Sequence, residues 1–403
     1  MNESGQSSAL RVAVVTETYP PEINGVANTM RHLVVGLGRR GHLVHLVRPR
    51  QRPDRTASSG LREIATETLV PGVPLPGYRG LRIGLPVYWR LRRIWNQPRP
   101  DAVYIATQGP LGHAALKAAI ALDIPAVTGF HTQFGQYSRH YGLGLLTQQI
   151  GQTLKHFHNR SDATLVPTVE LREQLAQEGF TNVHLFGRGV DTHLFSPTRR
   201  RRPLRAAWGC HEDSLVALYV GRLAAEKNLD LALTCFRAIA ARAPRTRFVL
   251  VGDGPELERL QRDFPDFCFT GPKTGEELAE HYASGDLFVF PSLTETFGNV
   301  VPEAMASGLA VVAFDYAAAH RYIQPWCNGV TVPTGDAQAF VTEALALTAD
   351  PTRLRKIGQQ ARATAETLDW DRVIRGIEKL LLHVIRERRG LENPRETVAA
   401  TTQ

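Results

Sequence analysis

Residues 287–308 read LFVFPSLTETFGNVVPEAMASG, a short apolar run that passes through a polar loop into a helical segment. The apolar run of Leu, Phe and Val residues is typical of a strand buried on both faces of a parallel sheet. Pro302 suits the first turn of a helix and Gly308 suits its end, so the helix is predicted to begin near Gly298 or Asn299. This stretch therefore predicts one strand–loop–helix unit of an α/β fold.

The same pattern recurs along the chain on both sides of this stretch. Amphipathic segments with helical spacing separate further short apolar runs. These runs cover residues 12–15, 43–47, 102–106, 126–130 and 163–166 in the first half, and 215–220, 248–251, 310–314 and 330–332 in the second. Two successive blocks of alternating strands and helices predict two doubly wound, Rossmann-like α/β domains.

The domain boundaries follow from breaks in this pattern. Residues 1–197 are predicted to form the first domain and residues 198–368 the second. Four arginines at 199–202, followed by a proline, oppose regular structure and are interpreted as a solvated linker, with a membrane or phosphate contact as the alternative. A helical stripe over 369–390 predicts a C-terminal helix, and the polar residues 391–403 predict a disordered tail.

Composition limits the class of protein. The 403 residues are 43% hydrophobic and 21% charged, which is ordinary for a globular chain. The four cysteines have no CxxC spacing, so neither a disulfide framework nor a zinc ribbon is expected. No apolar run approaches the ~20 residues that a membrane span needs, and no signal peptide is apparent at the start. We expect a cytoplasmic protein, with the inner face of the membrane as an alternative location.

The positive charge is concentrated in the first half of the chain. Residues 1–200 hold 23 Lys and Arg against 13 Asp and Glu, whereas residues 201–403 hold 24 against 26. This asymmetry predicts an anionic partner for the first half, either a membrane surface or a nucleic acid. No recognisable nucleic-acid-binding motif accompanies the charge, so no nucleic-acid partner is expected.

Two cations follow the first strand of the second block. Residues 221–228 read GRLAAEKN and place Arg222 and Lys227 after a strand end, at the carboxyl edge of a parallel sheet, where ligands bind in such domains. A guanidinium and an ammonium at that edge can hold two phosphates and neutralise a departing diphosphate. Together with Gly221, they are predicted to bind a diphosphate.

The loop and helix after 287–290 add acidic groups to an anion site. The free N–H groups of the expected helix start can bind a phosphate, and Glu295 and Glu303 flank that start. Carboxylates are poor phosphate ligands but good acceptors for sugar hydroxyls, so this combination indicates a nucleotide sugar. Four residues at the helix start are predicted donor contacts: Phe297, Gly298, Asn299 and Val300. An oxidoreductase is disfavoured because the glycine fingerprint of dinucleotide folds is missing after the first strand.

At these residues the chain resembles the retaining glycosyltransferases of family four, which have the GT-B fold. The family's two glutamates, separated by seven residues, match Glu295 and Glu303, and its phosphate-binding cations match Arg222 and Lys227. The segments VGDGPEL, at 251–257, and GVDTHLFSP, at 189–197, also match. The resemblance covers about residues 10–385.

The resemblance implies a fold, a division of labour and roles for residues. Two Rossmann-like domains would face a central cleft, the first binding the acceptor and the second the nucleotide sugar, with the C-terminal helix crossing back to the first. Transfer would proceed with retention, on one face of the sugar. The implied contacts are Glu295 to the donor-sugar hydroxyls, Glu303 to the ribose, Arg222 and Lys227 to the diphosphate, Gly25 near the phosphates, and His131 in GFHTQF to the sugar.

Within the family, residues 74–86 and 130–144 are similar to GDP-mannose-dependent α-mannosyltransferases and to enzymes that build sulfoquinovosyl- and glucosyl-diacylglycerol. The resemblance therefore implies transfer of a hexose, with GDP-mannose as the first expectation, to a hydroxyl of a membrane lipid or glycan acceptor. The alternatives are a UDP-sugar-dependent diacylglycerol glycosyltransferase and a nucleotide-sugar epimerase. No cofactor and no metal are expected, because no DxD pair is placed to hold magnesium.

Residues 79–95, RGLRIGLPVYWRLRRIW, mix five arginines with Leu85, Trp89 and Trp95. A basic amphipathic segment with aromatic residues can lie on an anionic bilayer. It can equally pack its apolar face on the core of its own domain. The sequence leaves both interpretations open.

Overall fold

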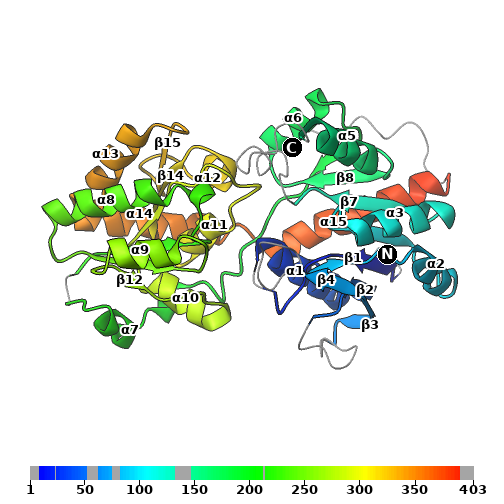
Figure 1. The fold of residues 1–403 in the computed structure, drawn as a ribbon, viewed down its shortest axis with the longest axis horizontal. Helices are drawn as coiled ribbons and strands as arrows, with labels where there is room; N and C mark the ends of the chain where they lie inside the picture. The colour runs from blue at the N-terminus through cyan, green and yellow to red at the C-terminus, as the bar shows by residue number, and fades with distance from the viewer. Residues whose placement is uncertain are drawn as a thin grey trace, which may run out of the picture. The chain divides into compact units, whose positions relative to one another are not determined.

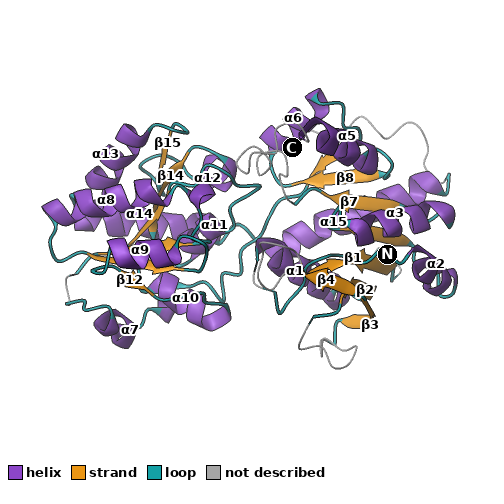
Figure 2. Cartoon of the chain, viewed as in Figure 1, coloured by secondary structure: helices purple, strands orange, loops and turns teal. Residues whose placement is uncertain are grey.

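The structure is a computed structural model that describes residues 9–22, 24–51, 62–74, 82–131, 147–211 and 214–390. The predicted tail, 391–403, lies outside the described residues, as do most of the 130–144 and 74–86 segments. The described residues divide into two compact units, the second of which is Arg188–Trp370, while residues 371–390 belong to the first. Figure 1 and Figure 2 show a layer of helices against each sheet. No helix in the described part of the chain is long and apolar enough to cross a bilayer.

The first unit is built on a seven-stranded sheet in the order β3-β2-β1-β6-β7-β8-β9, and all of its pairings are parallel. Its strands are β1 (Arg11–Val15), β2 (Leu43–Pro49), β3 (Ile64–Val70), β6 (Ala102–Ile105), β7 (Ala126–Gly129), β8 (Ala163–Val166) and β9 (Val183–Leu185). A separate antiparallel hairpin joins β4 (Gly72–Pro74) to β5 (Arg82–Gly84).

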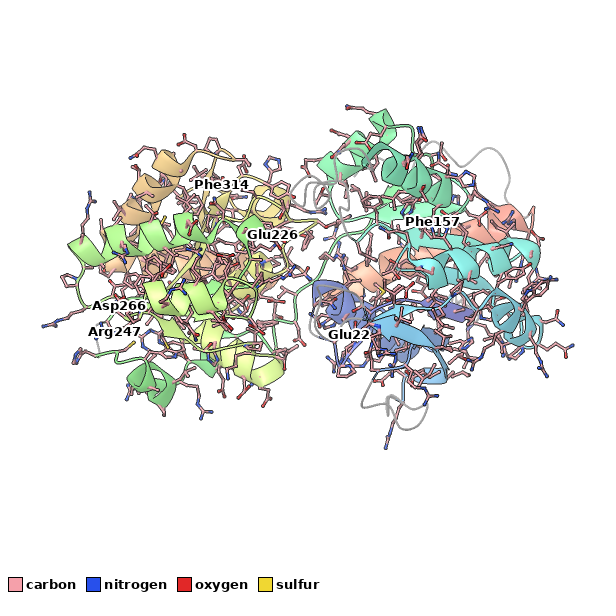
Figure 3. All side chains as sticks on the ribbon, in the orientation of Figure 1. Glu22, Phe157, Glu226, Arg247, Asp266 and Phe314 are labelled. Carbon is pink, nitrogen blue, oxygen red and sulfur yellow. The ribbon has the colours of Figure 1, made fainter. Side chains whose placement is uncertain are left out.

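The helices of the first unit are α1 (Gly25–Arg39), α2 (Tyr88–Asn96), α3 (Pro110–Ala121), α5 (Thr147–His158), α6 (Val169–Gln177) and α15 (Trp370–Arg388). Helix α1 begins where Asn24 caps it, because the Asn24 side chain accepts a hydrogen bond from Ala27 N–H at 2.8 Å. Phe157 of α5 is fully buried in the core between helices and sheet (Figure 3). Burying such a side chain contributes roughly 1.5–3 kcal/mol.

The second unit is built on a six-stranded parallel sheet in the order β12-β11-β10-β13-β14-β15. Its strands are β10 (Val216–Val220), β11 (Arg247–Val251), β12 (Cys268–Phe269), β13 (Leu287–Phe290), β14 (Ala310–Phe314) and β15 (Val330–Val332). Its helices are α7 (Arg202–Ala207), α8 (Leu229–Arg242), α9 (Leu257–Asp263), α10 (Gly275–Ala283), α11 (Val300–Ala306), α12 (Ala317–Tyr322), α13 (Ala337–Thr348) and α14 (Pro351–Ala365). Single turns of 3-10 helix are η1 (Pro197–Arg199) and η2 (Ala225–Lys227).

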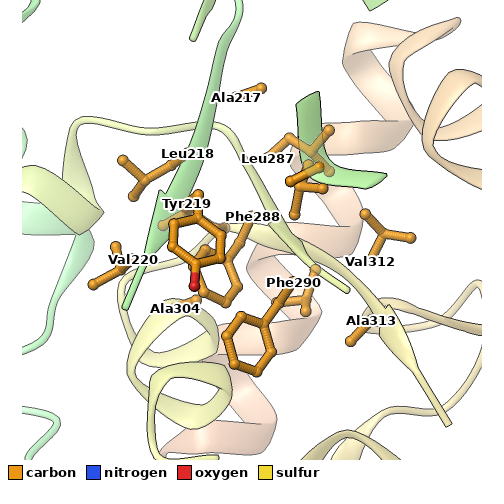
Figure 4. Close-up of a cluster of buried hydrophobic side chains, with 14 of the residues drawn as sticks. Ala217, Leu218, Tyr219, Val220, Leu287, Phe288, Phe290, Ala304, Val312 and Ala313 are labelled. Carbon is orange, nitrogen blue, oxygen red and sulfur yellow. The ribbon is translucent and has the colours of Figure 1, made fainter. Parts of the chain in front are cut away.

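The core of the second unit is formed by the central strands, whose residues are buried on both faces of the sheet (Figure 4). Phe288 and Phe290 on β13 stack with ring centroids 5.6 Å apart, and the ring of Phe290 lies 6.2 Å from that of Tyr219 on β10. The apolar runs predicted from the sequence are therefore strands, and the two doubly wound sheets confirm the predicted fold class.

The boundary between the units differs from the predicted one at 197. The N-terminal part of the first unit ends at Gly187, because residues 188–370 pack together as the second unit. Phe195 is buried in the core of the second unit, and its carbonyl accepts a hydrogen bond of 2.7 Å from Arg362. Helix α14 thus holds the segment in which the sequence placed the end of the first domain.

The arginines at 199–202 are mostly exposed to solvent, as expected, but Arg199 ends η1 and Arg202 begins α7, so the run is not an irregular linker. Arg200 pairs with Asp286 at 2.7 Å, and Arg201 pairs with Glu280 at 3.0 Å. The proline at 203 stands in the first turn of α7, where a missing N–H costs nothing. The charge run is ordered because acidic partners from α10 and the loop after it neutralise it, and these partners are distant in sequence.

The C-terminal helix packs on α1 of the first unit. At Gly36 an added Cβ would lie 2.6 Å from Ile374, so the glycine permits close approach of the two helices. Glu378 of α15 is buried and accepts hydrogen bonds from Arg40 at 2.8 Å and from His42 at 3.1 Å. Helix α15 spans Trp370–Arg388, within the predicted range.

Removing the Glu378 carboxylate tests this docking. Glu378→Ala is expected to lower the free energy of unfolding by about 2 to 3 kcal/mol, because it leaves Arg40 and His42 without their buried partner. The exposed Glu387→Ala on the same helix serves as the control and is expected to change it by less than about 0.5 kcal/mol. Urea unfolding of both variants makes the comparison, and equal effects would contradict the assigned role.

Candidate active site

The predicted diphosphate site lies at the carboxyl edge of the sheet in the second unit. Strands β10 and β13 pair in parallel, so the loops that leave Val220 and Phe290 emerge at the same edge. The first loop carries the sequence-predicted cations and the second carries Glu295. Chain segments about 70 residues apart in sequence therefore meet at one place, as the parallel topology requires.

Two glycines let the loops at this edge approach each other. Gly221 has φ +153° and Gly252, after β11, has φ +149°. A Cβ added to Gly252 would lie 1.9 Å from the carbonyl oxygen of Gly221, a distance that no side chain tolerates. Leu223 N–H also donates to Asp253 O at 2.9 Å, which ties the two loops together. Gly221 is therefore part of the site's framework.

Lys227 and Glu295 are in direct contact. Lys227 lies at the end of η2, and its Nζ donates to the Thr294 carbonyl at 3.2 Å and to Glu295 Oε1. Both side chains are mostly buried, at 12% and 17% exposure. A second hydrogen bond reaches Glu295 Oε1 from Ser292 Oγ at 2.8 Å. The ammonium and the carboxylate thus form one hydrogen-bonded group.

Arg222 has an acidic neighbour of its own. Its Nη1 lies 3.4 Å from Oε1 of Glu226, which is buried and labelled in Figure 3. The backbone carbonyl of Glu226 accepts from Thr294 Oγ1 at 3.3 Å. The Arg222 side chain remains 31% exposed, so part of its guanidinium faces solvent. Arg222, Lys227 and Glu295 therefore belong to one connected network.

Two tyrosines that the sequence analysis missed hold the backbone of the two loops that carry this network. Tyr316 OH is 2.7 Å from Glu295 N–H and also contacts the Glu295 carbonyl, so it fixes the backbone of the loop. Tyr219 is fully buried and donates to the Arg222 carbonyl at 3.1 Å. Burial raises the pKa of Tyr219 well above its ordinary value, and the nearby charges of Glu295 and Glu226 act in the same direction.

The loop after β13 turns into α11 as predicted. Gly298 has φ +84°, a conformation that favours glycine, and Asn299 precedes the first helical residue, Val300. The Phe297 side chain is buried and packs edge-on against Tyr322, with centroids 6.0 Å apart. If Phe297 contacts a ligand, it therefore does so through its backbone. A small recess at this turn is lined in part by Ser292, Glu295, Phe297, Gly298 and Tyr316.

Glu303 is placed differently from the other predicted residues. Its carboxyl is buried on α11 and accepts a hydrogen bond from Tyr282 OH at 3.1 Å, and no described contact links it to Lys227 or Glu295. Desolvation by burial raises the pKa of Glu303 to about 8, although the Tyr282 hydrogen bond opposes the shift. At neutral pH the carboxyl is therefore protonated and can donate a hydrogen bond as well as accept one.

The two remaining predicted residues belong to the first unit. Gly25 is the first residue of α1, immediately after the Asn24 cap. His131 follows β7 and is buried, with its Nε2 2.8 Å from Tyr104 OH. An added Cβ at Gly129 would lie 2.4 Å from His131 Nε2, so the glycine makes room for the imidazole ring. Both residues lie at the carboxyl edge of the first sheet.

Glu17 is a further titratable group at that edge, and the sequence analysis missed it. It follows β1, and its carboxyl accepts hydrogen bonds from Leu111 N–H at 3.0 Å and from Gly84 N–H. Desolvation by burial raises the pKa of Glu17 to about 7, against the opposing effect of these backbone donors. Its position in TETYP, shortly after the first strand, could have indicated that Glu17 lies at this edge of the sheet.

Comparison with known proteins assigns the family. Residues 23–194 match the family model described as "Glycosyltransferase Family 4", and residues 214–350 match "Glycosyl transferases group 1". A GDP-mannose-dependent alpha-mannosyltransferase of Mycobacterium tuberculosis is 35% identical over 337 residues, which cover 84% of this chain and 87% of that relative. The chain belongs to glycosyltransferase family 4. It is a glycosyltransferase that uses a nucleotide sugar.

A plant relative of this glycosyltransferase is also named as a transferase of a sugar group. The sulfoquinovosyl transferase of Arabidopsis thaliana is 30% identical over 377 residues, covering 90% of this chain and 72% of that relative. Among solved structures, sucrose-phosphate synthase from Thermosynechococcus elongatus superposes with a TM-score of 0.76 at 18% identity, over 94% of this chain and 100% of that one. The GT-B fold is thereby confirmed.

The buried Glu303 makes the stability of this glycosyltransferase depend on pH. The unfolded chain releases the Glu303 proton near pH 4.5, whereas the folded protein keeps it until about pH 8. The free energy of unfolding is therefore expected to fall as pH rises through this window. Relative to Glu303→Gln, wild-type protein should lose on the order of 3 kcal/mol between pH 5 and pH 8.5.

Chemical unfolding of wild-type and Glu303→Gln protein across this pH range measures that difference. The exposed Glu258→Gln on α9 is the matched control and is expected to follow the wild-type curve. Parallel curves for wild-type and Glu303→Gln protein would show that the carboxyl is ionised in the folded state.

Proposed function

We propose that this glycosyltransferase transfers a hexose from GDP-mannose to a hydroxyl of a membrane lipid or glycolipid, with retention of configuration. The observation that carries the proposal is the network of Arg222, Lys227 and Glu295 at the carboxyl edge of the second sheet. It combines cations suited to a diphosphate with a carboxylate suited to sugar hydroxyls. GDP-mannose is favoured because relatives at 35% and 33% identity are named as GDP-mannose-dependent alpha-mannosyltransferases.

The proposed roles follow from this arrangement. Lys227 and Arg222 stabilise the charge that develops on the leaving diphosphate, together with the N–H groups at the start of α11. Binding of the donor turns Lys227 towards a phosphate oxygen and leaves the Glu295 carboxylate to accept sugar hydroxyls. Glu303 is proposed to meet the ribose through its protonated carboxyl, and His131 to contact the transferred sugar. Gly25 lets the backbone approach the phosphates.

The acceptor attacks from the face that the diphosphate leaves, through an oxocarbenium-like state. The leaving phosphate oxygen takes the acceptor proton, so no protein carboxylate acts as the nucleophile. Charge stabilisation by Arg222 and Lys227 supplies what a divalent ion supplies in other transferases, and we propose that the reaction is independent of metal and of any cofactor.

A UDP-sugar-dependent diacylglycerol glycosyltransferase is the second candidate. It is favoured by the likeness to an alpha-monoglucosyldiacylglycerol synthase of Streptococcus pneumoniae, which is 25% identical over 319 residues. Both candidates use the same diphosphate network and differ in the base and the sugar. They also share an acceptor at the membrane surface.

The exposed residues of helix α2 and of the segment before it support the proposed membrane contact. Leu91 and Trp95 are fully buried in the core of the first unit, so part of the segment packs inward. Trp89, in contrast, is 75% exposed, and Leu85, before the start of α2, is 41% exposed. The Arg92 guanidinium lies 5.7 Å from the Trp89 ring centroid. An exposed indole among arginines suits an anionic lipid surface.

The donor base is tested by thermal shift, followed by a transfer assay. GDP is expected to raise the melting temperature more than UDP or ADP, because a ligand at 100 times its Kd stabilises a protein by about 2.7 kcal/mol. Transfer from GDP-mannose to a lipid extract should then proceed fully in excess EDTA and give an α-linked product. Stabilisation by UDP alone would favour the second candidate, and release of free sugar without an acceptor would indicate an epimerase.

Lys227→Ala tests the role of the ammonium. Turnover at saturating donor is expected to fall about 10²- to 10³-fold, because a preorganised group that stabilises the leaving charge is removed. Lys356→Ala, an exposed lysine on α14 of the same unit, serves as the control and should keep wild-type turnover. Unchanged turnover in Lys227→Ala would show that the ammonium does not act on the leaving group.

Trp89→Ser tests the membrane contact. Binding to vesicles that contain anionic lipid is expected to weaken about tenfold, because the exposed indole no longer inserts. Turnover on a detergent-solubilised acceptor should not change, since Trp89 does not pack in the core. Leu185→Ser, which alters an exposed apolar side chain on β9, is the control. Equal vesicle binding by wild-type and Trp89→Ser protein would contradict the contact.

A further inference from the structure

The first unit contains a pocket that no predicted site residue lines. Its volume is about 530 Å³, which lies in the range of small-molecule sites. Its polar lining consists of Arg50, Gln51, Arg82 and Arg90, and the remaining described lining is Leu69, Pro71 and Gly72. Three arginines and no acidic residue are among the described lining residues. The described lining of the pocket is therefore positively charged.

The topology of the sheet explains why these residues meet. Strands β2 and β3 are parallel, and Pro49 pairs with Val70 at their carboxyl ends. Arg50 directly follows β2, and its N–H donates to Val70 O at 2.9 Å. Arg82 comes from β5 of the hairpin and Arg90 from α2. The pocket therefore occupies the carboxyl edge of the first sheet, where ligands bind in doubly wound domains.

The arginines of the pocket differ from their buried neighbour, Arg48. The Arg48 guanidinium is neutralised by Glu67 at 2.7 Å, and both side chains are only 3% exposed. In the described part of the chain, no carboxylate pairs with Arg50, Arg82 or Arg90. Their charge is thus available to a ligand.

Two of these guanidinium groups are held in place by backbone carbonyls. Arg90 Nη1 donates to Leu69 O at 3.1 Å, and Arg82 Nη2 donates to Gly72 O. Each guanidinium has five N–H donors, so most donors of both side chains remain for a ligand. Arg82 Nε is buried without a hydrogen-bond partner among the described residues, and buried donors are normally satisfied. Fixed guanidiniums with spare donors bind oxyanions in a bidentate manner.

The pocket is joined to the loop that precedes α1. Glu22 of that loop, labelled in Figure 3, accepts hydrogen bonds from Gln51 Nε2 and from the backbone N–H of Arg82. Thr18 Oγ1 is a third donor to the same carboxylate. Gly25, which we propose to lie near the donor phosphates, begins the helix three residues later. The pocket therefore borders the part of the first unit proposed to serve transfer.

We propose that this pocket binds an oxyanion, a phosphate or carboxylate, carried by the headgroup of the acceptor. The inference rests on the proposed function in one respect, namely that the first unit binds the acceptor. It specifies that the acceptor is anionic, with its charged group bound between Arg50, Arg82 and Arg90. The headgroup is recognised in the pocket, whereas Trp89 serves attachment to the bilayer.

Calorimetric titration with small headgroup probes tests the pocket. The probes are glycerol 3-phosphate and glucuronate, with glycerol and glucose as neutral counterparts and inorganic phosphate as the free ion. Titrations in excess GDP, and separately into Arg222→Gln protein, exclude binding at the diphosphate site of the second unit. The double variant Arg50→Gln with Arg90→Gln is compared with Arg93→Gln, which changes an exposed arginine of α2 outside the pocket lining.

The expected result is that at least one anionic probe binds and its neutral counterpart does not. The double variant should weaken this binding roughly tenfold or more, because charge-assisted hydrogen bonds are lost. Arg93→Gln should bind as wild type does, and the thermal shift with GDP should be the same in all three proteins. In a transfer assay, the double variant should raise KM for an anionic acceptor and leave KM for the donor unchanged.

Three outcomes would overturn the proposal. The first is probe affinity that the double variant leaves unchanged, and the second is binding abolished by GDP or by Arg222→Gln. The third is inorganic phosphate binding as tightly as glycerol 3-phosphate, which would indicate a free-ion site. If no nucleotide stabilises the protein while the double variant still loses anionic probes, the proposed donor is wrong and the pocket stands.

Discussion

Parallel pairing of β10 with β13 places the ends of both strands at one edge of the sheet, and the contacts of the second unit follow from that constraint. The loops after Val220 and Phe290 have to meet there, and Gly221 and Gly252 let their backbones come together. Both strands are buried on both faces, so neither can shift without exposing apolar side chains. The sheet is therefore the rigid support on which the charged loops are positioned.

The charges at this edge are balanced before any ligand arrives. Lys227 is paired with Glu295 and Arg222 lies beside Glu226, so neither cation is left as an isolated charge in a largely buried place. In the proposed mechanism, an incoming diphosphate replaces these partners and does not simply add to them. The loops after β10 and β13 thus bring together cations suited to phosphate and a carboxylate suited to hydroxyls. The first unit differs, because the three pocket arginines have no such partner among the described residues.

The sequence predicted those features that depend on local pattern. Apolar runs identified the strands, and the proline and glycine of the 287–308 stretch located α11 closely. Features that depend on partners distant in sequence were missed. The ordering of the arginines at 199–202 needs Asp286 and Glu280, and the early end of the first unit needs Arg362 to hold Phe195. Nothing in the local sequence announces such pairings.

The candidate site shows the same division. Arg222, Lys227 and Glu295 were predicted as a group and are linked by described contacts, whereas Glu303 is buried against Tyr282. The sequence pattern placed Glu303 on α11. It could not predict the desolvation that raises the pKa of Glu303, because desolvation depends on the residues that pack around the carboxyl. Tyr316 contacts the backbone of Glu295, 21 residues away, which local spacing does not predict, whereas Tyr219, three residues before Arg222, was included in an apolar strand and given no further role.

We propose that the second unit binds its donor chiefly through the diphosphate. Calorimetric titration with GDP and GMP tests it most directly, because the two ligands differ only in the terminal phosphate. GDP is expected to bind at least about tenfold more tightly than GMP, and Arg222→Gln is expected to remove most of this difference. Equal affinities for the two nucleotides, or a preference for GDP that Arg222→Gln leaves intact, would contradict it.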